Sequence, residues 1–583
     1  MNQTNKNRIS IVLTLLFVLI PVMAMAQQLT PQEALNRVLQ NNESLSPELT
    51  QQVERVNTKK NVIPCYTASK GNNNYYFVFE VGGDDGFIIL SADKRAEPVL
   101  GYCDQGGFDI NDIPCNMKWL LDTYCNDIEI AIKHNLHNVP MRANYAAVSP
   151  LISSKWGQRS PYNDQLPIYS GNERCVTGCT ATAMAQVMYY HKWPTKGTGS
   201  HTYTDVIKGK EVTLSANFGN TTYQWSSMTN TYGSNSSSAS KQAVALLFKH
   251  IDVAVEMNFD DGNTNQSSAS YNKAAYALKT YFGYDDNIQV LYTSYWYSTY
   301  DSYWVDLYKK YYDSYWDDII CNELKHKRPV MHCGTNGQAN DGGHAFVIDG
   351  HDGKGKYHIN FGWDGQKDGY FALNAVKVPE WNYDFSHNYY MIIGIQKPLS
   401  SNQQYVELEL TDNLDVDESQ TGYDFRFSMI NRGEGCSKAY IGFSVEELAT
   451  GNKTYLSDND YCFMSIPWGF EDQYFMRIIK SNPSFPTKPG KYKATLAYKR
   501  FNTNNCLSFN NPKGYRNSFE FTIKSVKGDV NVDGTVNVTD VTTLVNMILG
   551  VIPKDQVHAD VDGSGTLNVS DVTALIRIIL GIH

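Results

Sequence analysis

The sequence predicts an α+β protein of several domains, and three observations support this fold class. A run of good helix formers begins at Cys179 and stops before Pro194, and two strand patterns follow it much later in the chain. Segments between about 399 and 525 alternate polar and apolar residues between turn signals, which is typical of a β-sandwich. A motif that starts at Asp529 starts again at Asp560, and an apolar helix pattern follows each copy. At 583 residues, the chain is long enough for a separate core in each part.

The N-terminus has the pattern of a secretory signal peptide. Lys6 and Arg8 precede an apolar run over 11–22, and Ala24-Met25-Ala26 follows it, so residues 1–26 are predicted to be removed after Ala26. The apolar run is too short for a membrane-spanning helix, and no later segment is long enough, so we expect no transmembrane segment. The 11 cysteines are odd in number, which suits a free thiol better than a disulfide framework. A net charge of −10 without a basic run argues against nucleic acid as a partner.

Residues 27–143 form a first predicted unit of helix, strands and helix. Thr30 suits an N-cap and Pro31 the first helical position. Two strands at 75–80 and 86–90 flank a Gly-Gly-Asp-Asp turn and predict a hairpin. The segment 138–144 is the predicted linker to the next domain. A substrate-binding accessory domain is the alternative interpretation of this unit.

Cys179 is the candidate nucleophile because of its place at the start of a helix. The positive end of the helix macrodipole and the unpaired N–H groups there stabilise a thiolate, so we expect its pKa to be lowered. A thiolate is the form of cysteine that attacks a carbonyl carbon. The plainer interpretation is a disulfide or a structural pair of thiols with Cys175, four residues earlier.

A candidate base lies on the first strand of a predicted hairpin over 343–350 and 356–363. If its turn is centred near Asp352, His344 lies opposite Asn360 on the same face of the sheet. Asn360 could then accept the imidazole N–H and fix the tautomer that removes the thiol proton. A register slip of one residue would separate the two side chains. His358 shares a strand face with Asn360 and is the rival base.

Four motifs together resemble the streptopain family of secreted bacterial cysteine peptidases. They are Trp156-Gly157-Gln158, the Thr-Gly-Cys-Thr-Ala-Thr-Ala run from Thr177, the Gly-His-Ala-Phe-Val-Ile-Asp-Gly strand, and Asn-Phe-Gly-Trp-Asp-Gly. The resemblance spans roughly residues 27–398. It implies a papain-like endopeptidase domain at 144–398, preceded by an inhibitory pro-domain at 27–143.

The same resemblance implies a role for each site residue. Cys179 is the nucleophile and His344 the base, and Gln158 donates to the oxyanion together with the Cys179 backbone N–H. Asn360 and Trp363 orient and shield the histidine. Phe361 stands where streptopain carries a tryptophan, which is a departure from the family pattern.

The region 399–525 is predicted to be a β-sandwich of immunoglobulin type, and its sequence shows no chemistry. A spacer or a weak adhesion module is the role that its pattern supports.

The duplicated motif at 526–583 predicts two structural calcium ions. Oxygen side chains at loop positions 1, 3, 5, 9 and 12, with glycine at position 6, are what one tight loop offers to Ca²⁺. Predicted helices over 541–549 and 572–580 follow the loops. The predicted ligands, with Thr535 and Thr566 at position 7, are Asp529, Asn531, Asp533, Thr535, Asn537 and Asp540 in the first loop, and Asp560, Asp562, Ser564, Thr566, Asn568 and Asp571 in the second.

This module resembles a type I dockerin. The resemblance implies docking to a cohesin-like protein, with partner choice at positions 10 and 11 of each loop, which are Val538, Thr539, Val569 and Ser570.

Two functions of different class follow from the sequence. The first is a secreted zymogen cysteine endopeptidase that forms a thioester acyl-enzyme, cleaves off its own pro-domain and needs no cofactor for catalysis. The second is a catalytically idle adhesion protein that uses the peptidase-like fold and the dockerin for binding. The joint presence of Cys179, His344, Gln158 and Asn360 favours the first.

Overall fold

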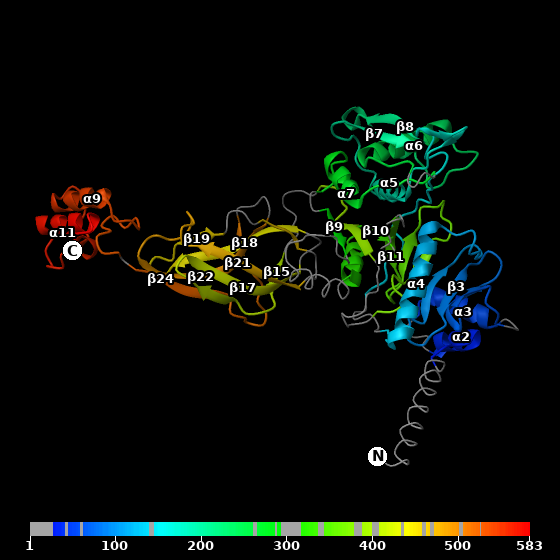
Figure 1. The fold of residues 1–583 in the computed structure, drawn as a ribbon, viewed down its shortest axis with the longest axis horizontal. Helices are drawn as coiled ribbons and strands as arrows, with labels where there is room; N and C mark the ends of the chain where they lie inside the picture. Colours follow the sequence, from blue (N-terminus) through cyan, green and yellow to red (C-terminus); the bar gives the residue numbers. More distant parts are fainter. Residues whose placement is uncertain are drawn as a thin grey trace, which may run out of the picture. The chain divides into compact units, whose positions relative to one another are not determined.

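The computed structural model describes most of the chain, which divides into two compact units, Met1–Gln403 and Gln404–His583 (Figure 1). The described residues are 27–40, 45–58, 62–138, 145–260, 265–285, 288–292, 316–335, 343–377, 388–398, 407–432, 437–457, 462–466, 471–500, 505–524 and 526–582. The predicted signal peptide and residues 139–144 of the predicted linker lie outside them. Among the described helices, none is both long and apolar enough to cross a bilayer.

The N-terminal part of the first unit packs helices on an antiparallel sheet. Pro31 and Pro47 each open a helix, because the fixed φ of proline suits the first helical position. Apolar residues of both helices share a core with β2 and β3, whose pairing confirms the predicted hairpin. The elements are α2 (Pro31–Gln40), α3 (Pro47–Asn57), β1 (Tyr66–Lys70), β2 (Asn73–Glu80), β3 (Phe87–Ser91), β4 (Val99–Cys103) and α4 (Cys115–His134).

The rest of the first unit contains the predicted helix at Cys179, which the structure confirms as α5 (Cys179–His191). Its apolar residues share one core with α6 and α7 and with residues of β10 and β11. The other elements are β5 (Ile168–Ser170), β6 (Glu173–Arg174), β7 (His201–Ile207), β8 (Lys210–Ala216), η2 (Phe218–Asn220), η3 (Trp225–Ser227), α6 (Ser238–Ala254), α7 (Tyr271–Thr280), β9 (Gln289–Tyr292), β10 (Val330–Thr335), β11 (His344–His351), β12 (Tyr357–Asn360), β13 (Gly369–Phe371) and β14 (Asn388–Ile393).

One sheet runs through both parts of the first unit. Its ten strands have the order β1-β2-β3-β4-β13-β12-β11-β10-β14-β9, so β4 pairs with β13 although the two strands are far apart in sequence. The junction is short, with Tyr102 opposite Tyr370 and Gly101 opposite Phe371. The rings of Tyr102 and Tyr370 stack with centroids 5.2 Å apart. Helix α4 packs against both β2 and β11 and so reaches across this junction (Figure 1).

A partly buried ion pair reinforces the junction. Lys356 Nζ lies 3.0 Å from Glu97 Oε1, and the exposed fractions of the two side chains are 4% and 29%. Asn138 Nδ2 donates to the other Glu97 oxygen at 2.8 Å, and its own oxygen accepts the Lys377 N–H. Burial alone would raise the pKa of Glu97, but Lys356, with Lys377 and Asn138, holds it below its ordinary value.

The second unit contains two antiparallel sheets over a common core. Residues of both sheets meet there, and the rings of Phe425 and Phe443 lie 4.5 Å apart. One sheet has β15 (Leu408–Leu410), β16 (Asp415–Glu418), β17 (Gly422–Asn431) and β21 (Glu471–Ile479). The other has β18 (Ser437–Glu447), β19 (Lys453–Leu456), β20 (Cys462–Ile466), β22 (Gly490–Arg500), β23 (Cys506–Ser508) and β24 (Ser518–Ile523).

The C-terminal helices are α9 (Val538–Ile548), α10 (Gln556–Ala559) and α11 (Val569–Ile579). Helices α9 and α11 begin three residues before the predicted starts, because Asn537 and Asn568 cap them in capping boxes with Asp540 and Asp571. Leu544 and Leu575 are fully buried in the small core that the helices share.

The Lys356–Glu97 pair should control how tightly β4 holds β13. Replacing Lys356 with Met leaves Glu97 partly buried without its cation, which should lower the free energy of local opening by about 1–3 kcal/mol. Because the folded pKa of Glu97 is lowered, the pair stabilises fully above the ordinary glutamate pKa of about 4.3. Its contribution is lost as pH falls through the folded value. Hydrogen exchange of the Glu97 and Ala372 amides, which bond across the junction, measures both effects.

Lys155→Met is the matched control. Lys155 makes an exposed 3.4 Å contact with Gln105 across the same interface, so its loss should change opening by at most about 0.5 kcal/mol. Equal effects of the two substitutions would refute the role of the buried pair.

Candidate active site

The start of α5 places Cys179 against strand β11. Gly178 precedes it with φ +80°, and a Cβ at this position would lie 2.8 Å from the Ser267 carbonyl oxygen, so glycine is required there. Cys179 Sγ accepts the Ala345 N–H at 3.4 Å and lies 3.8 Å from the Gly343 carbonyl oxygen. The sulfur therefore rests on the backbone on either side of His344.

The predicted lowering of the Cys179 pKa is wrong for the full-length chain, in which residues 27–138 are still present. Burial raises the pKa of the thiol, and the N–H groups of Ala345 and Thr180 oppose this only in part. The helix N-terminus supplies the expected donors, but loss of solvation outweighs them. Cys175 and Cys179 are both free, so the disulfide interpretation is wrong as well.

The predicted register between His344 and Asn360 is also wrong. Asn360 lies opposite Val347, and the pairing of β11 with β12 is irregular between Ile348 and Gly350. His344 instead lies opposite Gly334 of β10. Since side chains alternate along a strand, His344 lies on one face with Phe346, and Asn360 lies on the other face with Val347.

The turn between the strands explains the difference. Asp352 accepts the N–H groups of Lys354 and Lys356 at 2.7 and 3.0 Å, and Gly353 and Gly355 both have positive φ. These contacts build a longer loop, centred beyond Asp352, than the strand pattern indicated.

The Asn360 amide joins α5 to the hairpin. Its oxygen accepts Gln186 Nε2 at 2.9 Å and the Gly362 N–H at 3.0 Å. Its nitrogen donates to the Ser154 carbonyl oxygen at 2.9 Å and to Gln186 Oε1 at 3.2 Å. The sequence analysis missed Gln186, whose signal is a lone amide inside the apolar helix α5.

Backbone hydrogen bonds connect the segment of Gln158 to the segment before Cys179 and to the segment after Trp363. The Thr177 N–H, two residues before Cys179, donates to the Gln158 carbonyl oxygen at 3.2 Å. The Asp364 N–H donates to the Trp156 carbonyl oxygen at 3.2 Å. This hydrogen bond holds the residue after Trp363 beside the segment that leads to Gln158. In the described part of the chain the buried Trp363 indole N–H has no hydrogen-bond partner.

His358 belongs to a buried pair with Asp349. Its Nδ1 lies 2.6 Å from Asp349 Oδ1, and the other carboxylate oxygen accepts the Ile152 N–H at 2.8 Å. Burial alone would lower the pKa of His358, but Asp349, together with Asp368 and Asp104, raises it. The pair fixes residue 152 to the hairpin, which is a structural role.

Helix α4 packs against β11, and its Asn116 contacts the residues that follow His344 and Asn360. The buried Asn116 donates to the Ala345 carbonyl oxygen at 3.0 Å and to the Phe361 carbonyl oxygen at 2.7 Å. It therefore holds the residue after His344 and the residue after Asn360 together. No local pattern in the sequence marks Asn116, because its role depends on how α4 docks.

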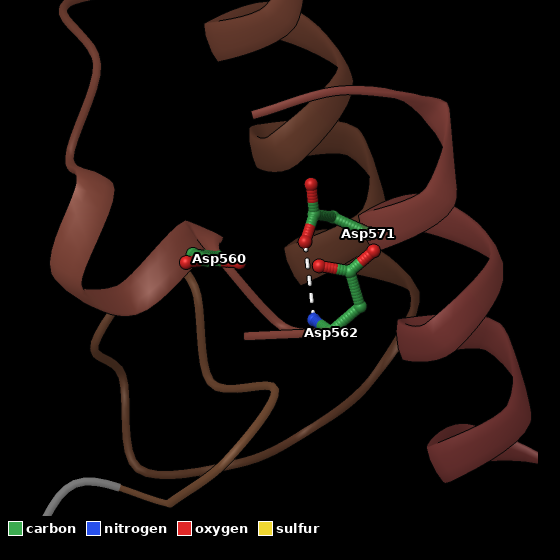
Figure 2. A group of neighbouring side chains, drawn as sticks. All are labelled: Asp560, Asp562 and Asp571. Carbon is green, nitrogen blue, oxygen red and sulfur yellow. Dashed lines mark hydrogen bonds between the residues drawn. The ribbon is translucent and has the colours of Figure 1, made fainter. Parts of the chain in front are cut away.

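The second C-terminal loop brings three carboxylates together, and Figure 2 shows Asp560, Asp562 and Asp571 facing a common centre. One oxygen from each lies within 4.8 Å of the others, and Asp560 Oδ1 is buried without a hydrogen-bond partner in the described part of the chain. A close set of hard oxygen donors with an orphaned carboxylate oxygen fits a calcium ion.

The first loop has the same backbone plan. Asp529 accepts the N–H groups of Asp533 and Gly534, as Asp560 accepts that of Gly565. Asn537 and Asn568, predicted as ligands, use their side-chain oxygens as helix caps in this structure. Position 9 of such loops often reaches calcium through water, so capping leaves that role open to them.

Three family models match parts of this chain. Residues 156–371 match the peptidase C10 family, residues 26–128 the Spi protease inhibitor and residues 527–580 the dockerin type I domain. Streptopain of Streptococcus pyogenes is 31% identical over 330 residues, covering 52% of this chain and 75% of streptopain. The thiol protease/hemagglutinin PrtT of Porphyromonas gingivalis is 29% identical over 326 residues, or 53% of this chain and 35% of PrtT.

Two similar solved structures are of one protein from Prevotella intermedia. A prointerpain A fragment has 33% identity and a TM-score of 0.46, and covers 57% of this chain and 98% of the fragment. Active interpain A has 34% identity and a TM-score of 0.35, and covers 44% of this chain and 98% of its own.

Substitution of His344 and of His358 should distinguish the predicted base from the histidine with a structural role. His344→Ala should lower kcat/KM for a peptide by about 10²–10⁴, because His344 is the predicted general base. His358→Ala should leave a working site but lower the free energy of unfolding by about 1–3 kcal/mol, since Asp349 stays buried without its partner. Asn360→Ala should lower both quantities moderately. Peptide kinetics beside urea unfolding distinguish these effects, and a folded but inactive His358→Ala protein would refute the assignment.

Calcium should order the C-terminal module. Carboxylates this close repel one another until a cation neutralises them, so calcium should raise the helical signal and the melting temperature of segment 526–583. Titration calorimetry of the full chain should show two ions. Asp560→Asn should remove one, while Asp555→Asn, outside both loops, should keep both.

Chelation should leave hydrolysis of a small peptide unchanged, because the predicted ions lie only in this module. A segment indifferent to calcium would contradict the assignment of the loops.

Proposed function

This chain belongs to the peptidase C10 family and is therefore a cysteine-type peptidase. On this basis we propose that it is a secreted zymogen endopeptidase of papain-like fold. Cys179 is the nucleophile in this proposal and His344 the general base. The observation that carries it is the contact of Cys179 Sγ with the backbone of Gly343 and Ala345, because it brings the start of α5 to the residues that flank His344.

The proposed reaction divides hydrolysis into two steps. His344 takes the proton of Cys179, and the thiolate sulfur bonds to the carbonyl carbon of the scissile peptide. The carbonyl oxygen becomes an oxyanion, which the Gln158 side chain and the Cys179 N–H stabilise. His344 then gives the proton to the leaving amine as the C–N bond breaks and a thioester remains. Water, deprotonated by His344, attacks the thioester and releases the thiol and the acid.

Asn360 and Trp363 are positioning residues in this proposal. Asn360 fixes the hairpin against α5 through Gln186, and so sets how far β11 lies from Cys179. Trp363 lies three residues after Asn360, the last residue of β12, and shields His344 from water.

The segment 27–143 is the proposed inhibitory pro-domain. Asn116 holds the backbone beside His344, and burial raises the pKa of the Cys179 thiol. Removal of α4 would release both constraints. The chain then activates itself by cleavage in the linker 138–144.

The C-terminal unit is proposed to attach the peptidase to a partner protein. An immunoglobulin-like sandwich separates the peptidase from a dockerin that holds two calcium ions and binds a cohesin-like protein. The signal peptide at 1–26 sends the protein out of the cell, to the medium or to the bacterial cell surface.

Cys179→Ala tests the proposed function. The variant should cleave neither casein nor its own pro-domain, because both reactions need the thiolate, and the secreted chain should persist as the full-length precursor. Gel analysis over time and casein hydrolysis under reducing conditions measure this.

Cys175→Ala is the matched control, since it removes a buried free thiol four residues away and should keep both activities. Casein hydrolysis by the Cys179→Ala protein would overturn the proposal in favour of another nucleophile. An intact native chain that binds but never cleaves would favour the adhesion function.

A further inference from the structure

The carboxylate of Asp364 lies on Gly157, the residue directly before Gln158. A Cβ added to Gly157 would meet the two carboxylate oxygens of Asp364 at 2.5 and 2.7 Å. The absence of a side chain at 157 therefore lets the carboxylate pack on the backbone there. Asp364 has φ +56°, a left-handed conformation that aspartate adopts more readily than most residues. Its N–H donates to the Trp156 carbonyl oxygen at 3.2 Å, so its backbone and its side chain hold two consecutive residues.

The surroundings of this contact are fixed by the core. Trp156 is fully buried, and its indole N–H donates to the Thr229 carbonyl oxygen at 2.9 Å. The Tyr162 ring packs on Trp156 with centroids 6.1 Å apart, and its buried hydroxyl has no hydrogen-bond partner in the described part of the chain. Although part of Asp364 is exposed, burial raises the pKa of its carboxyl, and the neighbouring Tyr162 hydroxyl opposes this rise. Asp364 is thus held against the core.

Gln158 has few contacts of its own. Its carbonyl oxygen accepts the Thr177 N–H at 3.2 Å, and its side chain is half-buried. Among the hydrogen bonds of the described residues, none involves its side-chain amide. Glycine is the most flexible residue of a backbone, so a restraint on Gly157 affects how precisely the next residue is placed. The backbone of Gln158 is therefore held on one side by Thr177, two residues before Cys179, and on the other by Asp364.

We propose that Asp364 is a positioning residue that holds Gln158 where its side-chain amide can donate to the oxyanion. This inference rests on the proposed function, in which Gln158 and the Cys179 N–H stabilise that oxyanion. Asp364 and Gly157 both lie in the segment that matches the peptidase C10 family, so neither is removed with the pro-domain. A donor contributes only when it is aimed at the place where charge develops. A displaced Gln158 therefore loses stabilisation of the transition state while binding of the substrate is kept.

Kinetics of the activated enzyme on one peptide test this role. Asp364→Ala should lower kcat by about ten- to hundredfold and change KM by less than about threefold, because a misplaced donor fails in the transition state. Asp364→Asn keeps a planar group of the same size on Gly157 and should restore most of the native kcat. Variants that mature slowly are processed with immobilised native enzyme, which is then removed. Alkylation of the active thiol normalises the enzyme concentration.

A double-mutant cycle measures whether Asp364 acts through Gln158. Gln158→Ala should lower kcat by about 10²–10³, the loss typical of one oxyanion donor. In that background Asp364→Ala should lower kcat by less than about threefold more, because the group that it positions is gone. If Asp364→Ala fails to fold, Gly157→Ala gives the same test, since its Cβ would displace the carboxylate and residue 157 has an ordinary φ. It should lower kcat in the native chain and have little effect in the Gln158→Ala background.

Asp164→Ala is the matched control and should keep the native kcat. Asp164 is exposed, lies two residues after Tyr162, and its side chain has no hydrogen bond or ion pair in the described part of the chain.

A native kcat in Asp364→Ala, a loss that is equal with and without Gln158, or a change in KM alone would overturn the positioning role and leave the peptidase function standing. A Gln158→Ala enzyme with native kcat would overturn the oxyanion role of Gln158 and this inference, but not Cys179 as nucleophile. A native chain that cleaves neither the peptide nor casein would overturn the proposed function, and this inference with it.

Discussion

The alternation of side chains along β11 is the constraint on which the first unit depends. Ala345 and Val347 face α5 and share its core, while Phe346 faces α4 and contacts Trp119. A single strand thus carries the backbone that Cys179 touches and the surface that the pro-domain covers. A one-residue change of register would exchange the two faces and separate both sets of contacts.

The same register places the proposed nucleophile and the proposed base on different faces of the sheet. Cys179 and Asn360 lie on the α5 side of the sheet, while the register assigns His344 to the side of α4. The pairing of β4 with β13 is short, and side-chain contacts of Tyr102, Lys356 and Trp119 add to it. An interface built in this way can be strong while the linker is intact and weak after it is cut, because cleavage adds the entropy of a free domain.

The sequence was sufficient to predict the helix at Cys179 and the strands of the hairpin. It was not sufficient to predict the register of the strands or the tertiary contacts. The helix at Cys179 follows from local composition, and the structure contains both strands of the hairpin. Their register failed because the Asp352 side chain and a strand irregularity, which no alternation pattern reveals, lengthen the turn. The Cys179 pKa failed in direction because its burial is tertiary. Asn116 and Trp119 carried no local signal, since their importance comes from a strand pairing between distant segments.

The sequence predicted the position of the two C-terminal loops, and in the second loop the structure brings three of the predicted ligands, Asp560, Asp562 and Asp571, close together. Each loop carries its ligands within one short stretch, so spacing alone orders them. What spacing missed is that Asp540 and Asp571 also close the capping boxes of α9 and α11. Each of these carboxylates accepts two backbone N–H groups, one from the loop and one from the cap. Because one side chain joins loop closure to the start of a helix, we expect binding of a calcium ion to the loop to favour formation of the helix.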